Sequence, residues 1–309
     1  GRCIALSTPN GVGNGFHKTC VNAEEGENDF FVSNLPWDVH PERDKAWFEK
    51  ETRNMSSRQI AQELECNFNT SGETVIHPND IAFVKSTVKE PNYRTGFDRN
   101  YWIWEEWKSD EEYVVLADVA RGDGKDSSAF HVFKISTMEQ VAEYQGKPSL
   151  DMYANILYQV GKEYGDALLV VENIGIGISV LEKLELLGYN KLYYSLKGTH
   201  EYIEQEVAYT RSDSVPGFST TVKTRPLIIA KMEEFIRNKL VILRSSRLAN
   251  EMSTFIWKNG KAQAMRGYND DLIISFAIAC WVRDTALTAN EREQQYTEAF
   301  FNALVTSNK

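Results

Sequence analysis

The feature that most constrains the fold of this chain is the order of its apolar patterns between residues 112 and 188. Three strand patterns come first, and a tight turn, RGDGKDSS, separates the first two. A helix pattern, a continuous apolar run and a second helix pattern follow. In chain order the patterns are EYVVLADVA (112–120), AFHVFKI (129–135), EQVAEYQ (139–145), SLDMYANILYQVGKEYG (149–165), ALLVVEN (167–173) and IGISVLEKLELLG (176–188). This order predicts an α/β fold in which helices flank a mixed sheet.

The residues before 111 have weaker patterns. Residues 3–6, CIAL, form an apolar run before a Ser-Thr-Pro-Asn-Gly turn, which predicts a short buried strand and a domain that starts upstream of this chain. A helical pattern runs from Pro41 to about Glu65, with Pro41 in its first turn. Residues 78–110 are aromatic and polar without a clear period, which predicts a linker.

Further elements are expected nearer the C-terminus. Residues 209–221 are polar and contain Gly and Pro, which predicts a mobile loop. Residues 225–239 have a helix pattern, and LVIL at 240–243 is expected to be a strand.

Composition favours a soluble cytoplasmic protein. The chain has 309 residues and is 42% hydrophobic, so it can bury one large core or two smaller ones. Its four cysteines are scattered without a C-x-x-C pair, which argues against a disulfide framework and against zinc. The longest apolar run, at 272–282, is shorter than the roughly 20 residues of a membrane-spanning helix, so no membrane partner is expected.

The charge is unevenly distributed. A net charge of −10 counts against a nucleic-acid partner, because Lys and Arg supply most of the affinity for phosphates. Between residues 195 and 268, however, twelve Lys and Arg stand against seven Asp and Glu. This surplus fits either a basic stripe or a solvated helix face, and the sequence leaves both open.

Five acidic residues lie at the edges of these elements, in three separate segments. Asp118 lies in an otherwise apolar strand pattern, where a carboxylate is costly to bury unless it is paired or bound to a metal. Asp126 follows the tight turn, and Glu172 ends the second buried run. Asp270 and Asp271 open the last helix, where the helix dipole favours anions. Asp126 can also be interpreted as an ordinary turn residue without a catalytic role. Asp270 can likewise be interpreted as a neighbour of a helix N-cap.

A cluster of these acids would need divalent cations to remain ionised. Oxygen ligands without His or Cys select hard ions such as Mg²⁺ or Mn²⁺, and two such ions can activate water and stabilise a leaving oxygen in phosphodiester hydrolysis. The histidines have no paired ligand spacing and are expected on the surface or in packing: His17, His40, His77, His131 and His200.

The stretch ALSTPNGVGNGFHKT, residues 5–19, is similar to a phosphate-binding loop only at first sight. That loop needs Gly directly before its Lys-Thr pair and again five residues earlier, so that backbone N–H groups can approach the phosphates. His17 and Val12 occupy those positions. The stretch is therefore not a phosphate-binding loop.

Several motifs in this order resemble the large terminase subunit of tailed bacteriophages. LADVARGDGKDSS (116–128), VVENIGIG (170–177) and GYNDDLIISFA (267–277) resemble its nuclease domain. LSTPNGVGNGFHK (6–18) and IAQELECNF (60–68) are similar to segments at the end of its ATPase domain. The resemblance implies an RNase H-like fold of the resolvase and integrase type at 111–309, preceded by a C-terminal remnant of the ATPase domain at 1–77 and a linker at 78–110.

The resemblance also implies roles for the acidic residues. Asp118, Glu172 and Asp270 would be ligands of two Mg²⁺ or Mn²⁺ ions. Asp126 and Asp271 would support them or take a bridging role, and the sequence does not decide which of Asp270 and Asp271 binds metal directly. The family usually has His before this Asp pair, where this chain has Asn269, so no proton-transfer role is carried over to that position.

Two basic residues match positions that the family places close to DNA. Lys223 and Arg225 are the candidates, and a solvated pair at a helix start is the alternative.

The function implied is a metal-dependent endonuclease that cleaves concatemeric double-stranded viral DNA during genome packaging. The implied partners are DNA, a small terminase subunit and the procapsid portal, in the host cytoplasm. No ATPase activity is expected from this chain alone, because no phosphate-binding loop occurs in it. A junction resolvase of the same fold and a non-catalytic portal-docking module are the alternatives.

Overall fold

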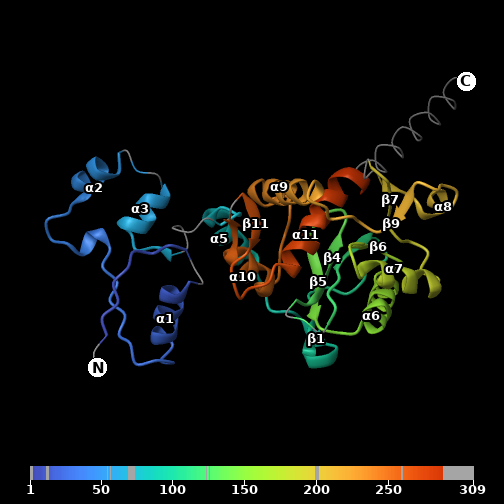
Figure 1. The fold of residues 1–309 in the computed structure, drawn as a ribbon, viewed down its shortest axis with the longest axis horizontal. Coiled ribbons are helices and arrows are strands. Elements are labelled where there is room, and N and C mark those ends of the chain that lie inside the picture. The colour runs from blue at the N-terminus through green and yellow to red at the C-terminus, as the bar shows by residue number, and fades with distance from the viewer. Residues whose placement is uncertain are drawn as a thin grey trace, which may run out of the picture. The chain divides into compact units, whose positions relative to one another are not determined.

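The structure is a computed structural model that describes residues 3–11, 14–53, 55, 57–68, 74–122, 124, 126–198, 202–258 and 260–287. The chain divides into two units. Figure 1 labels helices and strands from both. The first consists of Gly1–Phe83 and Ala249–Asp270, and the second of Val84–Leu248 and Asp271–Lys309. The acidic motifs therefore fall on both sides of a unit boundary that separates Asp270 from Asp271.

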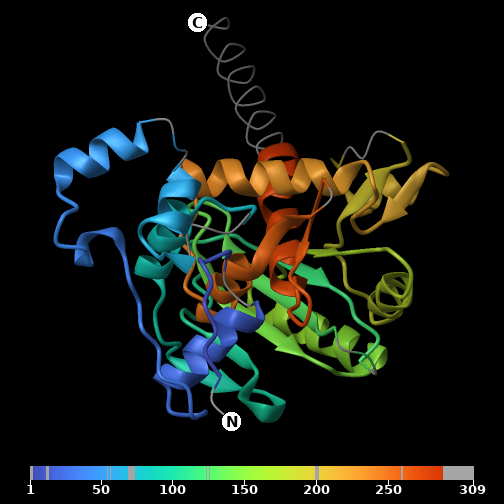
Figure 2. The same ribbon diagram turned by 60° about the vertical axis from the view of Figure 1, so that its left-hand side comes forward.

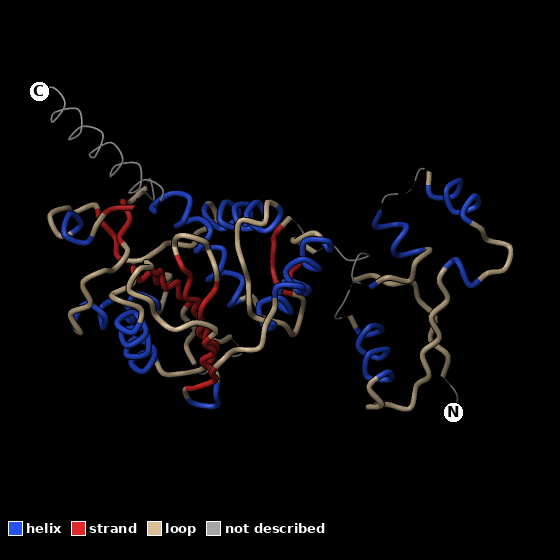
Figure 3. Tube along the Cα trace, turned by 180° about the vertical axis from the view of Figure 1, so that it is seen from behind, coloured by secondary structure: helices blue, strands red, loops and turns tan. Residues whose placement is uncertain are grey.

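The second unit is built on a six-stranded mixed sheet, as the order of apolar patterns predicts (Figure 3). The strand order is β1-β2-β5-β4-β3-β6, and only the β3–β6 pair is parallel. The strands are β1 (Tyr93–Thr95), β2 (Tyr101–Ile103), β3 (Tyr113–Asp118), β4 (Ser128–Lys134), β5 (Gln140–Gly146) and β6 (Leu168–Val171).

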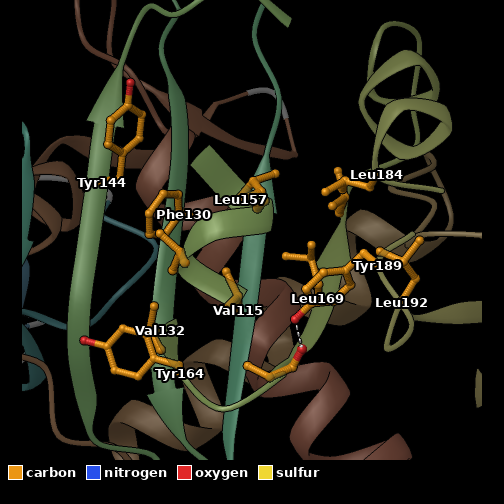
Figure 4. Close-up of a cluster of buried hydrophobic side chains, with 14 of the residues drawn as sticks. Val115, Phe130, Val132, Tyr144, Leu157, Tyr164, Leu169, Leu184, Tyr189 and Leu192 are labelled. Carbon is orange, nitrogen blue, oxygen red and sulfur yellow. Dashed lines mark hydrogen bonds between the residues drawn. The ribbon is translucent and has the colours of Figure 1, made fainter. Parts of the chain in front are cut away.

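One face of this sheet packs on α6 (Leu150–Glu163) and α7 (Gly177–Leu186). Alternate strand residues such as Val115 and Phe130 join Leu157 of α6 in a buried apolar cluster (Figure 4). Fully burying such a side chain contributes about 1.5–3 kcal/mol. This cluster holds the helices that follow β5 and β6 against the sheet.

The opposite face packs on α11 (Asp271–Val282), which lies against α9 (Thr224–Arg237) (Figure 2). Phe133 of β4 meets Phe276 of α11 with ring centroids 5.7 Å apart. Every residue of α11 except Trp281 is buried. Burial between the sheet and α9 therefore explains why this helix is apolar on all sides. No helix in the described parts of the chain is both long enough and apolar enough to span a membrane.

The segment 78–110, expected to be a linker, is structured over much of its length. It contains α5 (Pro78–Thr87), and β1 and β2 extend the sheet beyond β5. Tyr101 of β2 packs on Phe130 with ring centroids 5.6 Å apart. A strand of only three residues is too short to show an alternation of apolar and polar side chains in the sequence. The aromatic contacts of these strands therefore become apparent only in the folded sheet.

Two expectations near the C-terminus also need correction. The predicted loop 209–221 contains β9 (Ser214–Pro216), which pairs with β7 (Tyr194–Leu196) beside β8 (Tyr202–Ile203) and α8 (Gln205–Ala208). The predicted strand 240–243 makes only a single bridge, between Ile242 and Glu139. After α11 (Asp271–Val282) the described chain ends in a π-helical turn, η3 (Arg283–Leu287).

The first unit is mainly helical. Its elements are α1 (Gly15–Glu24), η1 (Trp37–Val39), α2 (Lys45–Thr52), α3 (Ser57–Glu63), and the hairpin of β10 (Phe255–Lys258) and β11 (Lys261–Ala264), which α10 (Ser246–Thr254) precedes. The predicted strand 3–6 is wrong, because Ile4 and Leu6 are 86% and 90% exposed and no described strand pairs with them. The helix expected from Pro41 begins at Lys45, where the Asp44 side chain caps it.

Residues 5–19 end in α1 and form no strand-to-helix phosphate loop over their described part. Asn14 caps α1 by accepting a hydrogen bond from the His17 amide at 2.9 Å. Val12 and His200 lie outside the described residues. Of the other histidines, His40 and His77 are exposed, as expected.

A buried polar network lies between the sheet and the start of α11. His131 of β4 is fully buried, and its Nε2 lies 2.9 Å from the carbonyl oxygen of Leu272. Gln140 Nε2 donates to His131 Nδ1 at 2.8 Å and to Glu143 at 3.1 Å. Arg247 Nε donates to Glu143 Oε1 at 2.7 Å. These partners fix His131 as a neutral ring that carries its hydrogen on Nε2.

The buried state of His131 predicts a pH-dependent stability. Burial lowers the pKa of His131, nearby Glu143 opposes this, and Arg247 adds to it. Below pH of about 6.5 the unfolded chain binds a proton that the folded chain excludes, so the free energy of unfolding should fall as pH decreases. Urea unfolding between pH 7.5 and 5.5 should show a steeper fall for wild type than for His131→Gln, by up to about 1.4 kcal/mol per pH unit. Parallel curves would contradict this.

Candidate active site

Asp118 and Glu172 lie side by side at one edge of the sheet. β3 and β6 are parallel with Ala117 opposite Val171, and the Glu172 amide donates to the Ala117 carbonyl at 2.9 Å. Asp118 is therefore the last residue of β3, and Glu172 directly follows the end of the neighbouring strand β6. The sequence predicts that the two acids converge, and the register brings them together.

Asp271 reaches the same edge from α11. It is the first residue of the helix and is 7% exposed, and its Oδ2 accepts a hydrogen bond from the Ser127 amide at 2.9 Å. Ser127 directly precedes β4, in which Ala129 pairs with Asp118 of β3. β4 thus links the positions of Asp118 and Asp271, which are 153 residues apart in the sequence.

The electrostatics of the three acids show that they form one group. The pKa of Asp118 is raised far above its ordinary value, first by burial, then by the charge of Glu172 and a hydrogen bond with its side chain, and then by the charge of Asp271. Asp118 keeps some exposed surface, but protein atoms surround its carboxyl group closely enough for burial to dominate. Without a cation, this arrangement favours the neutral carboxyl group of Asp118.

Tyr153 of α6 anchors the strand ends behind the acids. Its hydroxyl group lies within hydrogen-bond distance of the carbonyl oxygens of Asp118 at 3.1 Å and Ala129 at 2.7 Å. Burial and then the charge of Asp118 raise the pKa of Tyr153, so it remains a neutral donor. The tyrosine therefore fixes the backbone that carries Asp118.

The end of β6 is held by the segment that follows β9. Asn173 donates its amide to the Phe218 carbonyl at 2.9 Å and its side-chain Nδ2 to the Pro216 carbonyl at 2.8 Å. Ser219 Oγ donates to Asn173 Oδ1 at 2.8 Å. Sequence analysis missed Asn173 as a site residue, and its position directly after Glu172 is the only local signal for it.

Two glycines allow this close packing around Glu172. A Cβ at Gly177, the first residue of α7, would overlap the Glu172 carbonyl oxygen. A Cβ at Gly217, which has φ of +76°, would overlap the Val171 carbonyl oxygen. Backbone thus packs directly on backbone on both sides of the strand end.

The chemical type of the ligand atoms in this group suits a hard divalent cation. Three carboxylates with no His or Cys among them suit Mg²⁺ or Mn²⁺, and their mutual repulsion favours a positive ion. Among the described residues, however, no three His, Cys, Asp or Glu side chains are arranged around a common point for a metal. In this structure Asp118 and Glu172 are hydrogen-bonded to each other instead.

The other predicted site residues differ in their exposure and in the element that carries them. Asp126 is exposed, one residue before Ser127. Asp270 is half-buried and ends the first unit, so the structure does not relate it to Asp118. Lys223 is exposed at the start of α9, and Arg225 is half-buried in its first turn.

The difference between the two adjacent aspartates gives a test. For the metal-dependent DNA cleavage that the terminase resemblance implies, Asp271→Asn is expected to slow the reaction about 10²-fold or more, since Asp271 shares the sheet edge with Asp118. Asp270→Asn, the matched control, should slow it by less than about 10-fold. Initial rates of plasmid nicking measure both. The reverse order would assign the ligand role to Asp270.

Comparison with known proteins gives an independent view of what this chain is similar to. No known family model matches the chain. The sequence is 24% identical over 277 residues to the large terminase subunit of Thermus virus P23-45, covering 87% of this chain and 50% of that protein. It is also 24% identical over 251 residues to that of Thermus phage G20c, covering 79% of this chain and 44% of that protein. The chain is therefore similar in sequence to the large terminase subunits of these two phages.

A solved structure supports the same fold. The large terminase nuclease of phage G20c with bound magnesium superposes with a TM-score of 0.50 at 16% identity, covering 65% of this chain and 95% of that one. This likeness agrees with the expected α/β fold, a mixed sheet flanked by helices. The chain spans about half the length of the curated terminase relatives it matches.

Proposed function

We propose that this chain is a metal-dependent endonuclease of the terminase type, which cleaves concatemeric double-stranded viral DNA during genome packaging. The observation that carries the proposal is the meeting of Asp118, Glu172 and Asp271 at one sheet edge, from three segments far apart in the sequence. Buried carboxylates held this close oppose folding, and such groups are concentrated at functional sites.

Asp118, Glu172 and Asp271 would hold Mg²⁺ or Mn²⁺, with two ions expected and with Asp270 and Asp126 as further candidate ligands. When bound, the ions would supply an activated water and neutralise charge on the phosphodiester. The Ser127 amide orients one oxygen of Asp271. Tyr153 holds the backbone of Asp118, and Asn173 fixes the end of β6 beside Glu172.

Lys223 and Arg225 are proposed to contact the DNA backbone. They follow Phe218 and Ser219, the residues that hold the end of β6, so the chain leads from the acids directly to these cations within a few residues. Contacts to phosphates position the duplex without reading its sequence, so little base specificity is expected.

Replacing these two cations should weaken DNA binding in a salt-dependent manner. Lys223→Ala and Arg225→Ala should each lower the slope of log K against log salt concentration by about 1, because each phosphate contact releases counterions. Fluorescence anisotropy with a labelled duplex at several salt concentrations measures the slope. Lys183→Ala, on the exposed face of α7, is the control and should leave the slope unchanged.

The remaining roles rest on the terminase relationship. A small terminase subunit and the procapsid portal are proposed as partners, and the host cytoplasm as the place of action. Residues 1–77 are proposed to be the last part of an ATPase domain.

A supercoiled plasmid tests the proposal directly. The chain with Mn²⁺ or Mg²⁺ should convert it to nicked and linear forms, and EDTA should stop the reaction. Glu172→Ala should be inactive under the same conditions. Equal cutting by wild type and this variant would refute the mechanism, and a strong preference for a four-way junction over linear duplex would indicate a resolvase instead.

A further inference from the structure

Two hydrogen bonds tie the first turn of α11 to one segment of the sheet. The Ser127 amide donates to the Asp271 side chain, and His131 Nε2 lies 2.9 Å from the carbonyl oxygen of Leu272. Ser127 and His131 are four residues apart along the β4 segment, whereas their partners are consecutive residues of the helix. Two fixed points of this kind determine where the helix begins and how its first turn is rotated.

The His131 ring is held in one orientation from its other side. Gln140 Nε2 donates to His131 Nδ1, so the ring hydrogen must lie on Nε2 and point to Leu272. The other end of that amide, Gln140 Oε1, accepts from the amides of Arg244 at 2.8 Å and Ser245 at 3.0 Å. The orientation of Gln140, and with it the tautomer of His131, is therefore set by the backbone.

Apolar contacts also hold α11 against the sheet. Phe133 against Phe276 is an example, and contacts of this kind give attraction without strong direction. A hydrogen bond between buried groups is directional, and leaving its acceptor unpaired costs about 1–3 kcal/mol. His131 supplies such a directional contact in the first turn of α11, at the residue next to Asp271.

We propose that His131 is a positioning residue for the metal centre. Through the Leu272 carbonyl it holds the start of α11 so that Asp271 faces Asp118 and Glu172, and it thereby raises the affinity of the three carboxylates for a divalent cation. The inference rests on the proposed function, since it assumes that these acids bind metal. Partners that orient metal ligands in this way typically contribute 10–100-fold in affinity.

Titration of the chain with Mn²⁺ by calorimetry, without DNA, tests the role independently of cleavage. His131→Phe keeps a ring in the pocket but loses the donor, and its Kd should rise about 10-fold or more. His131→Gln places an amide nitrogen near the position of Nε2, and its Kd should stay within about 3-fold of wild type. His131→Asn has a shorter side chain that does not reach Leu272, so it should resemble the Phe variant.

Phe133→Leu is the matched control. It removes packing beneath the same helix without touching the hydrogen bond, so it should lower the melting temperature and leave the Kd for Mn²⁺ unchanged. If His131→Phe does not fold, the comparison of Gln with Asn decides the question. Equal affinities for Gln and Asn, or for Phe and wild type, would overturn the inference and leave the proposed nuclease intact. Absence of Mn²⁺ binding by wild type would overturn both.

Discussion

Replacing Asp118 by Asn is expected to reduce metal-dependent nicking of plasmid DNA by about 10³-fold or more. Asn keeps the volume of the side chain and can still accept a hydrogen bond from the Val119 amide, so the local fold should persist. What it loses is the charge at the centre of the acidic group. Initial rates at saturating Mn²⁺ measure the loss. Asp151→Asn, an exposed acid on α6, is the control and should cleave at the wild-type rate.

The same substitution should stabilise the protein when no metal is present. Burial and the neighbouring charges of Glu172 and Asp271 disfavour the charged form of Asp118, and Asn removes that cost. The melting temperature in EDTA should therefore rise, by roughly 2–4 °C for each kcal/mol gained. A gain in stability together with a loss of activity is the pattern expected of a functional site. A variant that melts earlier and cleaves normally would show that Asp118 has only a structural role.

Replacing Gly177 by Ala is expected to slow cleavage about 10²-fold although Gly177 carries no functional group. The added methyl group overlaps the Glu172 carbonyl oxygen, and because the obstacle is backbone, the end of β6 or the start of α7 must move. Either movement displaces the Glu172 carboxylate from Asp118. Overpacking of this kind also costs about 1–3 kcal/mol of stability. Plasmid nicking and thermal unfolding together measure the two effects.

Gly161→Ala separates displacement of the site from loss of stability. A Cβ at Gly161, within α6, would overlap the buried hydroxyl group of Tyr189, which donates to the Ala167 carbonyl. This variant should therefore lose stability as Gly177→Ala does, and it should cleave at nearly the wild-type rate. Equal losses of activity in the two variants would mean that general destabilisation, and not the position of Glu172, explains the effect.

The element order of the second unit could be predicted because its patterns are strong and local. β3, β4, β5 and β6 are all present where the sequence places them, and so are the helices between and after them. β1 and β2 could not be predicted, because three-residue strands carry no period and depend on neighbours such as Phe130. The run at residues 3–6 failed for the opposite reason, since an apolar pattern does not form a strand without a partner edge.

The sequence named the acidic candidates of the proposed site, but it did not give their geometry. Asp118 and Glu172 each follow a buried apolar run, and the sequence identified both for that reason. The choice between Asp270 and Asp271 depends on where α11 begins and on the amide of Ser127, which is 144 residues away. His131 was expected on the surface or in packing, like the other histidines, and its buried contact with Leu272 was not foreseen.

By itself the sequence determined the kinds and order of the elements between residues 112 and 188, and which strand ends there carry a carboxylate, because side-chain period and turn chemistry are local properties of the chain. Only the tertiary structure decided that Asp271 joins Asp118 and Glu172, and that Tyr153, Asn173 and Gly177 hold the backbone around them. Those contacts depend on strand register and helix docking between distant segments. Many alternative pairings between distant segments are compatible with the local patterns, and the close packing of the core allows only one of them.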